Sequence, residues 1–441
     1  MDAGGVKKIS FWVAVRLAAG TTAPSNVAAS WRTATTRCRI ATRTPASALL
    51  CRACQKMRLQ GDVSSALGKG TAVHVNVTGK IRKGTGRASS GTSNARPDAN
   101  MHTEKNLYPK VYDFQNLYQA YQNAIKKKRW RVSAMRFGRH LEENLIELQN
   151  ELIYETYQPG AYYSFYVEEP KRRFVMAAPF RDRVLHHAVC NVIGPIFEQG
   201  FFFHSYACLP GKGTLAGVEA TEKMLREYGE RKAYCLKCDV YHYFASIDHD
   251  VLKRLIRKRI GDRKLLRLLD VIIDSTEEDA GIPLGNLTSQ LFANIYLTEL
   301  DRFVRQDLRA RHYVRYMDDF ILLSEDKAEL RRWQQDIEGF LDTRLNLRLN
   351  HKTAIFPVSR GIDFLGYRIW PHRRLLRKRM IKRMRRALKH FQHGKKVNWA
   401  HARGAVASWL GVVCNSDAKQ IREAMESIAW RWFGIGKGRA E

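Results

Sequence analysis

Tyr316-Met317-Asp318-Asp319 places two adjacent carboxylates between two apolar runs, 313–316 and 320–323, that indicate β-strands. Like charges at a tight turn repel each other, and burying an ionised carboxylate without a partner is costly, so a cation is the natural reason for the pair. A third carboxylate, Asp239, ends another strand-like run, 234–238. The competing interpretation is a solvated turn that binds no metal.

Two carboxylate-bearing strands that meet at one point would form a two-metal site for nucleotidyl transfer. One Mg²⁺ would lower the pKa of a primer 3′-hydroxyl, and the second, about 3.5–4 Å away, would hold the triphosphate and the leaving pyrophosphate. Mg²⁺ prefers hard oxygen ligands and keeps some of its waters. We therefore expect two Mg²⁺ ions per site, with Mn²⁺ as the alternative ion.

The composition predicts a polyanionic partner. The 441 residues include 75 Lys plus Arg against 43 Asp plus Glu, a formal charge of +32, and such a surface neutralises nucleic-acid phosphates. No apolar run is long enough to span a membrane, so we expect no membrane partner. Eight cysteines in a chain of this length indicate a reducing compartment, the cytoplasm. The pairs Cys51/Cys54 and Cys235/Cys238 have zinc-ligand spacing, but a strand would point the second pair to opposite faces.

Residues 1–100 differ from the rest, because they hold three acids against 16 Lys plus Arg and show little sustained periodicity. Such a leader is a transit peptide, a nucleic-acid-binding arm, or a disordered or non-native extension produced by a mis-called start codon. We favour the last, with translation beginning at Met101.

From residue 101 onward, helical periodicity alternates with short strand-like runs. Residues 137–157 predict one helix, 162–167 and 174–177 predict a basic β-hairpin, and 345–349 alternates like a strand. The order strand, helix, helix, hairpin, helix, strand predicts an α+β fold, a split βαβ sheet with its helices on one face.

From about Tyr108 to Ile435 the chain resembles reverse transcriptases, and within them those of diversity-generating retroelements. The matching segments occur in the family's order: 171–183, Lys237-Cys238-Asp239 with Phe244-Ala245-Ser246-Ile247-Asp248, 281–296, 316–319 and Phe364-Leu365-Gly366-Tyr367. The resemblance implies an RNA-directed DNA polymerase shaped as a right hand. Its fingers would be 101–230, its palm with an antiparallel sheet, the metal site and the primer grip 231–370, and its helical thumb 371–441.

The resemblance also implies roles for single residues. Asp239, Asp318 and Asp319 would be the catalytic metal ligands, together with the Val240 carbonyl. Phe244 would be a steric gate against the ribose 2′-hydroxyl, although a plain core position is the alternative. The remaining nucleotide contacts would be Arg173 and Arg181 at the triphosphate, Leu284 and Gly285 at the incoming nucleotide, and Lys352 as a general acid for pyrophosphate; residues 364–367 would form the primer grip.

The stretch Ile282-Pro283-Leu284-Gly285-Asn286-Leu287-Thr288-Ser289-Gln290 narrows the subfamily. Most reverse transcriptases carry Gln at the position of Leu284 and Pro at that of Gln290, whereas diversity-generating enzymes carry an aliphatic residue and Ser-Gln. An aliphatic side chain cannot hydrogen-bond to the new base pair, so selectivity should fall. We therefore expect error-prone copying, which in the family occurs mainly opposite template adenine.

The partners implied by the resemblance are a template RNA and its cDNA, dNTPs, and a small basic accessory variability protein that is an oligomer. The host would be a prokaryote, or the gene phage-encoded. The alternatives are a group II intron-like or retron-like reverse transcriptase and, without enzymatic activity, a basic RNA-binding scaffold.

Overall fold

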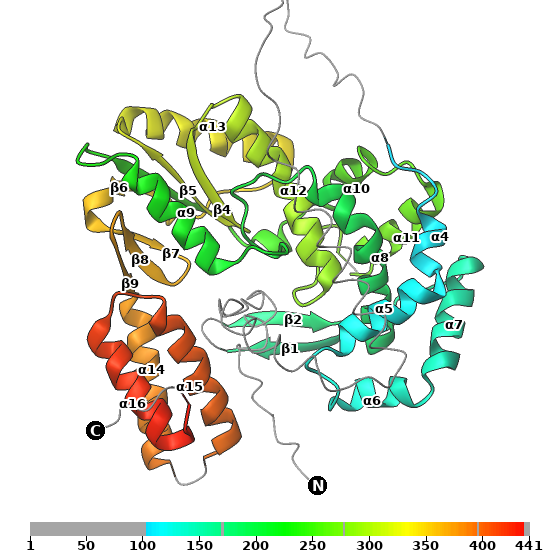
Figure 1. Cartoon of the computed structure of the whole chain (residues 1–441). Helices are drawn as coiled ribbons and strands as arrows, with labels where there is room; N and C mark the ends of the chain where they lie inside the picture. The colour runs from blue at the N-terminus through cyan, green and yellow to red at the C-terminus, as the bar shows by residue number, and fades with distance from the viewer. Residues whose placement is uncertain (1–102, 169–171, 277, 395–396, 436–441) are drawn as a thin grey trace, which may run out of the picture. The chain divides into compact units, whose positions relative to one another are not determined.

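The strands that carry the three aspartates belong to one antiparallel sheet of four strands, in the order β4-β5-β3-β6 (Figure 1). The computed structural model describes residues 103–168, 172–276, 278–394 and 397–435, which belong to one compact unit. Several residues of the sequence analysis lie outside the described ranges: the predicted extension 1–100 with Cys51 and Cys54, Met101, and Lys171.

Short helices precede the sheet. Asp113 begins α5 because its side chain accepts a hydrogen bond from the Asn116 N–H, which has no partner within the first turn. The single helix predicted for 137–157 is wrong, because His140, with φ −124° and ψ 55°, interrupts it. The elements of this part are α4 (Tyr108–Tyr112), α5 (Phe114–Ile125), α6 (Val132–Arg139), α7 (Leu141–Ile153), β1 (Tyr163–Val167), β2 (Arg173–Ala177), α8 (Phe180–Glu198) and α9 (Thr214–Arg226).

The four-stranded sheet consists of β3 (Tyr234–Asp239), β4 (His312–Tyr316), β5 (Asp319–Ser324) and β6 (Ala354–Pro357). Alternate residues point to opposite faces, so Leu236, Cys238 and Leu322 enter a first hydrophobic cluster with α10, α12 and α13. Cys235 and Leu323 enter a second cluster with α9 and the C-terminal helices. Helices therefore cover both faces, and the prediction of helices on one face is wrong. Cys235 and Cys238 lie in different clusters and do not converge.

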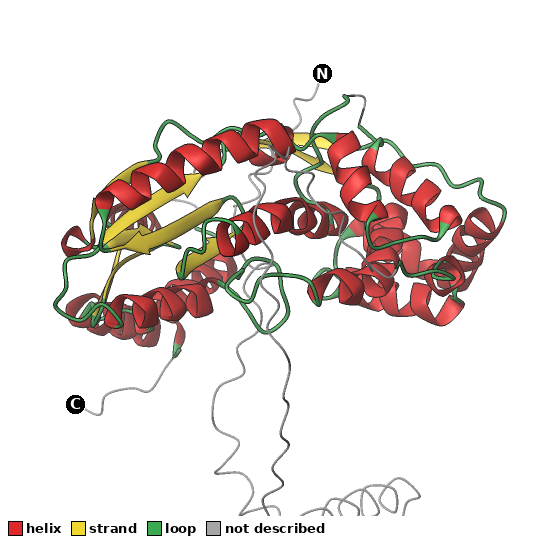
Figure 2. Ribbon diagram, turned by 90° about the horizontal axis from the view of Figure 1, so that it is seen from above, coloured by secondary structure: helices red, strands yellow, loops and turns green. Residues whose placement is uncertain are grey.

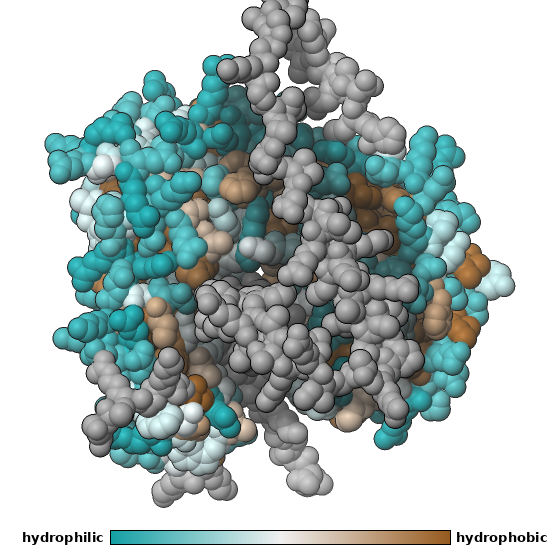
Figure 3. Space-filling view, in the orientation of Figure 1, coloured by the Kyte–Doolittle hydropathy of each residue, from teal (hydrophilic) through white to brown (hydrophobic). Residues whose placement is uncertain are grey.

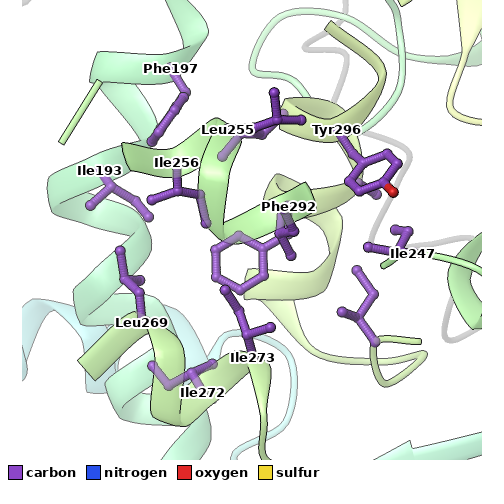
Figure 4. Packing of buried hydrophobic residues seen from close by; sticks show 14 of the residues in the cluster. Ile193, Phe197, Ile247, Leu255, Ile256, Leu269, Ile272, Ile273, Phe292 and Tyr296 are labelled. Atoms are coloured by element: carbon purple, nitrogen blue, oxygen red, sulfur yellow. The ribbon is translucent and has the colours of Figure 1, made fainter. Parts of the chain in front are cut away.

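In the first cluster, helices α8, α10 and α11 pack against α12. Figure 4 shows their side chains: Ile193 and Phe197 from α8, Leu255 and Ile256 from α10, Leu269, Ile272 and Ile273 from α11, and Phe292 and Tyr296 from α12. The bounds are α10 (His249–Arg257), α11 (Arg263–Ile273), α12 (Leu287–Gln306) and α13 (Lys327–Leu345), and a 3-10 turn spans Tyr243–Ala245. The strand predicted for 345–349 is also wrong, since α13 continues to Leu345 and only Leu349 forms a bridge, to Val240.

After β6 and a 3-10 turn (Val358–Arg360) follows a three-stranded antiparallel sheet, and then three helices end the described chain. The strands are β7 (Ile362–Phe364), β8 (Tyr367–Trp370) and β9 (Arg373–Leu376), and the helices are α14 (Lys378–His393), α15 (Trp399–Cys414) and α16 (Lys419–Phe433). Apolar residues of both groups share the second cluster. The α+β class with antiparallel sheets and helices is confirmed, and Figure 2 shows that helices account for most of the ordered elements.

The face of the described chain seen in Figure 3 is mainly hydrophilic, with smaller apolar areas. Within the described ranges, no helix combines the length and the apolar character needed to cross a membrane.

Candidate active site

The three predicted aspartates meet at one end of the four-stranded sheet. Asp239 ends β3, Asp319 begins β5, and the two residues are direct cross-strand partners. Asp318 lies in the turn before β5, and its carbonyl oxygen accepts a 3.2 Å hydrogen bond from the Val240 N–H. Met317 in this turn has a φ of 56°, in the left-handed region that few non-glycine residues adopt. The geometry brings the three carboxylates together, and their role as metal ligands stays a prediction.

The charges at this point are poorly neutralised. Burial raises the pKa of Asp318 to about 6, and the charge of Asp239 adds to the shift. Burial also raises the pKa of Asp319, although Lys237 opposes the change. Asp319 Oδ1 is buried and accepts no hydrogen bond from any described residue, although Lys237 Nζ lies 3.3 Å away. Excess negative charge with an unsatisfied carboxylate oxygen fits a divalent cation.

Two of the carboxylates have competing partners within the protein. Asn350 Nδ2 donates to Asp239 Oδ2 at 3.0 Å, and Lys237 Nζ lies 3.3 Å from Asp319 Oδ2. With the side chains in these orientations, no three His, Cys, Asp or Glu residues of the described chain are grouped so that they could hold a metal ion. These two contacts engage Oδ2 of each carboxylate, and Asp319 Oδ1 accepts no hydrogen bond from any described residue.

A cavity of about 690 Å³ lies between the β1–β2 hairpin and the loop before α12. Phe244 lines it and also packs against the first cluster, so the ring has both of the predicted environments. Leu284 lines the same cavity, Gly285 lies against the backbone of β2, and Gln290 is on α12 outside the lining. The walls are largely apolar and include Ser164, Phe174, Met176, Ile282 and Pro283.

The family model for reverse transcriptase (RNA-dependent DNA polymerase) matches residues 168–369. The chain contains a reverse transcriptase domain. The domain includes the whole four-stranded sheet and all three aspartates. It is the domain of an RNA-directed DNA polymerase, and reverse transcriptases generally depend on a divalent metal ion.

Two named relatives match at least half of the chain. Protein YkfC from Escherichia coli (strain K12) is 28% identical over 266 residues, which are 50% of this chain and 70% of YkfC. Group II intron-encoded protein LtrA from Lactococcus lactis subsp. cremoris is 24% identical over 371 residues, 65% of this chain and 59% of LtrA. A solved structure of apo telomerase from Candida tropicalis, truncated from its C-terminal domain, covers 54% of this chain and 60% of that chain at 12% identity. Its TM-score of 0.37 is too low to support an argument.

The basic residues predicted for the reverse transcriptase domain differ in their surroundings. Arg173 begins β2, and its charge opposes the raised pKa of Asp318. The fork of Arg181 is instead occupied, because Nη1 donates to Glu151 Oε1 at 2.9 Å and Nη2 donates to the Gln158 carbonyl at 3.0 Å. The structure therefore does not bring Arg181 to the carboxylates. The roles of both arginines stay predictions.

Lys352 and the predicted primer grip lie in loops next to the aspartates' partners. The Lys352 N–H donates to Asn350 Oδ1 at 3.1 Å, in the loop that also contacts Asp239. Residues 364–367 form the turn between β7 and β8, in which Leu365 and Gly366 have φ of 49° and 93°. Lys352 and the turn 364–367 thus lie close to residues that contact Asp239 and Asp319. Their roles as general acid and as primer grip stay predictions.

Two charged residues to which the sequence analysis gave no role of their own support the site. Lys237 on β3 joins the turn of the aspartates to the next sheet, because its Nζ also donates to the Asp363 carbonyl at 2.7 Å. Arg315 on β4 is fully buried, donates to the Met317 carbonyl at 3.2 Å, and pairs with Asp301 at 2.6 Å. A charged residue inside an otherwise apolar strand run was the available signal in both cases.

Proposed function

We propose that this protein copies the template RNA of a diversity-generating retroelement into error-prone, adenine-mutagenic cDNA, which diversifies a target protein gene. The observation that carries the proposal is Leu284, which lines the cavity beside Pro283 and Phe244. A leucine there offers no hydrogen bond to the incoming nucleotide. The loss of one such contact is worth roughly 1.4 kcal/mol, or about tenfold in discrimination.

The aspartates would hold two Mg²⁺ ions, with the Val240 carbonyl nearby, and the ions would activate the primer 3′-hydroxyl and bind the leaving pyrophosphate. Asp319 would offer Oδ1, which accepts no hydrogen bond from any described residue, while Lys237 and Asn350 would stay near Oδ2 of Asp319 and of Asp239. Buried negative charge that is incompletely paired is unfavourable, which favours a cation at this point.

The other residues would bind and orient the nucleotide. Phe244 would exclude a ribose 2′-hydroxyl from the cavity, and Gly285 would let the backbone approach the nucleotide closely. Arg173 would contact the triphosphate directly, while Arg181 would do so only after releasing Glu151. Lys352 would donate a proton from Nζ to the departing pyrophosphate. The turn 364–367 would hold the primer end, and Gln290 would contribute to fidelity through α12.

The same proposal includes the organisation and partners of the chain. Fingers at 101–230, a palm at 231–370 and a thumb at 371–441 would enclose a duplex of template RNA and cDNA. The small basic accessory variability protein would bind as an oligomer. The enzyme would act in the cytoplasm. Its origin in a prokaryote or phage is supported by the bacterial origin of YkfC and LtrA.

A group II intron-like reverse transcriptase is the second candidate, with a retron-like enzyme as its variant. It is supported by the similarity to LtrA and to the putative COX1/OXI3 intron 2 protein of Saccharomyces cerevisiae, which is 20% identical over 339 residues. A basic RNA-binding scaffold is the non-enzymatic candidate. It is disfavoured because a scaffold would not need three aspartates at one end of the sheet.

One experiment separates these candidates. The purified protein extends a primed RNA with dNTPs and Mg²⁺, with and without the accessory protein, and the product is sequenced. We expect cDNA with substitutions opposite template adenines, and about tenfold fewer of them with Leu284→Gln. Leu266→Gln on α11, which does not line the cavity, is the control. An error rate that Leu284→Gln leaves unchanged would remove the diversity-generating assignment, faithful cDNA would favour the intron-like enzyme, and no cDNA would favour the scaffold.

A further inference from the structure

His249 lies beside the loop that walls the nucleotide cavity and makes two polar contacts. It is buried at the start of α10, where its Nε2 lies 2.8 Å from the Gly281 carbonyl oxygen and its Nδ1 lies 3.1 Å from Asp274 Oδ1. Asp274 also accepts a 2.7 Å hydrogen bond from Lys253 Nζ. His249 does not line the cavity.

Both partners of His249 are acceptors. A carbonyl oxygen carries no proton, and an ionised carboxylate only accepts, whereas a neutral imidazole has a single N–H to donate. Of the two partners, the Gly281 carbonyl oxygen is the nearer, at 2.8 Å against 3.1 Å for Asp274 Oδ1. A buried side chain of α10 therefore contacts the Gly281 carbonyl in addition to the backbone contacts of the loop.

Gly281 is where this contact reaches the cavity. Its φ of 98° is in the left-handed region, and a Cβ there would lie 3.3 Å from the Ala245 backbone. The Gly281 N–H donates to the Ile247 carbonyl, and the Ile282 N–H donates to the Phe244 carbonyl, each at 2.8 Å. The loop is thus fastened to the segment of Phe244 on one side and to His249 on the other.

The segment before His249 is itself anchored. The Asp248 N–H donates to the Tyr296 hydroxyl at 3.3 Å, and Ile247 belongs to the cluster around Phe292 and Tyr296 (Figure 4). His249 therefore lies on a well-anchored segment, and Gly281, which it contacts, begins the loop that continues to Leu284.

We propose that His249, oriented by Asp274, is a positioning residue that fixes the spacing between Phe244 and Leu284 and so sets the selectivity of the cavity for the incoming nucleotide. This inference rests on the proposed function, because it assumes that the cavity binds dNTPs. It adds residues that touch neither substrate nor metal but act through the Gly281 carbonyl.

The test compares His249→Phe, which keeps a ring and removes both polar contacts, with His249→Gln, which keeps one donor for Gly281. Steady-state kinetics would give kcat and KM for dNTPs and rNTPs on primed RNA. We expect His249→Phe to lose about tenfold of the discrimination against rNTPs and to raise KM for dNTPs with kcat within about twofold, and His249→Gln to restore part of the loss.

His312→Phe is the matched control, because His312 on β4 also contacts a carboxylate, Glu227, at 2.9 Å but does not touch the cavity loop. It should leave the discrimination unchanged. If His249→Phe does not fold in a thermal melt, Asp274→Asn replaces it, since the Asp274 side chain is 48% exposed. Wild-type selectivity in His249→Phe, or in Asp274→Asn where it is the substitute, would overturn the inference.

Failure of the proposed function gives a different result. If the wild-type protein makes no cDNA, the proposed function is wrong. The inference is then tested by nucleotide binding, measured as the shift in melting temperature that dATP causes compared with the shift that ATP causes. A preference for dATP that His249→Phe abolishes would still support the inference, and the same preference in both proteins, or its absence, would contradict it.

Discussion

Two antiparallel hairpins of this chain have the same local geometry and opposite surroundings. In β4–β5 most residues are buried and none is exposed. In β1–β2 no residue is fully buried, and Tyr163, Tyr166 and Phe174 are 72%, 55% and 48% exposed. The first hairpin is thus held inside the protein by its neighbours, whereas the second presents aromatic side chains to solvent.

The polar contacts of the two hairpins differ in the same way. Arg315 in β4 is fully buried and is held by both oxygens of Asp301. Asp301 raises the pKa of Arg315 in spite of burial, which favours the neutral form. Arg172, beside β2, stacks over the Tyr166 ring at 4.1 Å with most of its side chain in solvent. Only the first interaction should matter for stability.

Arg315→Met therefore breaks the comparison most strongly. Removing one partner of a buried pair leaves Asp301 charged and unpaired, so the free energy of unfolding should fall by about 3–5 kcal/mol. Arg172→Met, the matched change at the exposed hairpin, should alter it by less than about 0.5 kcal/mol. Urea unfolding followed by circular dichroism measures both. Equal decreases in the free energy of unfolding for the two variants would mean that the Arg315–Asp301 pair does not stabilise the β4–β5 hairpin.

The raised pKa of Asp318 gives the next largest effect. Because its folded-state pKa of about 6 lies above the ordinary 3.8, folding favours the protonated carboxyl. Without divalent metal, the free energy of unfolding should carry no penalty from Asp318 below about pH 4. It should fall by on the order of 1–3 kcal/mol as the pH rises through 6 and the carboxyl ionises. Asp318→Asn should remove this loss, and Mg²⁺ should reduce it.

Thermal melts from pH 4 to pH 7 in EDTA and in Mg²⁺ follow the change. Glu168→Gln, next to the exposed hairpin, is the control and should leave the profile as it is. A wild-type melting temperature that rises through this range relative to that of Asp318→Asn would contradict the assignment of a destabilised carboxylate.

Phe244→Val sharpens the comparison at the cavity beside the β1–β2 hairpin. A smaller side chain should admit the ribose 2′-hydroxyl and raise rNTP incorporation relative to dNTP about tenfold, or roughly 1.4 kcal/mol. Competition assays with both nucleotides on primed RNA measure the ratio. Unchanged rejection of rNTPs together with a lowered melting temperature would leave Phe244 a core residue only.

Tyr163→Ser should have the smallest effect on folding. The exposed ring contributes little to the core, so the unfolding free energy should stay within about 0.5 kcal/mol of wild type. Affinity for single-stranded RNA should fall about fivefold, because an aromatic ring that stacks on a base contributes on the order of 1 kcal/mol. A large loss of stability with unchanged RNA binding would mean that the two hairpins do not differ as described.

The part of the fold that sequence reasoning found is the part with strong local signals. The pair Asp318-Asp319 between apolar runs located the β4–β5 hairpin, and the run 234–238 located β3. The break at His140 and the end of the predicted strand at 345–349 depend on tertiary packing, which overrides periodicity. Lys237 has partners 82 and 126 residues away, and such long-range contacts leave no pattern in the sequence.

The most direct test of the account is Mg²⁺-dependent extension of a primed RNA by the wild-type protein and by Asp239→Asn, Asp318→Asn and Asp319→Asn, each with a verified melting temperature. Asp336→Asn, an exposed carboxylate on α13, is the control. The account predicts that each of the three variants loses at least about 10³-fold in rate, since each removes stabilisation of transition-state charge, while the control keeps wild-type activity. Extension at the wild-type rate by any of the three folded variants would contradict it.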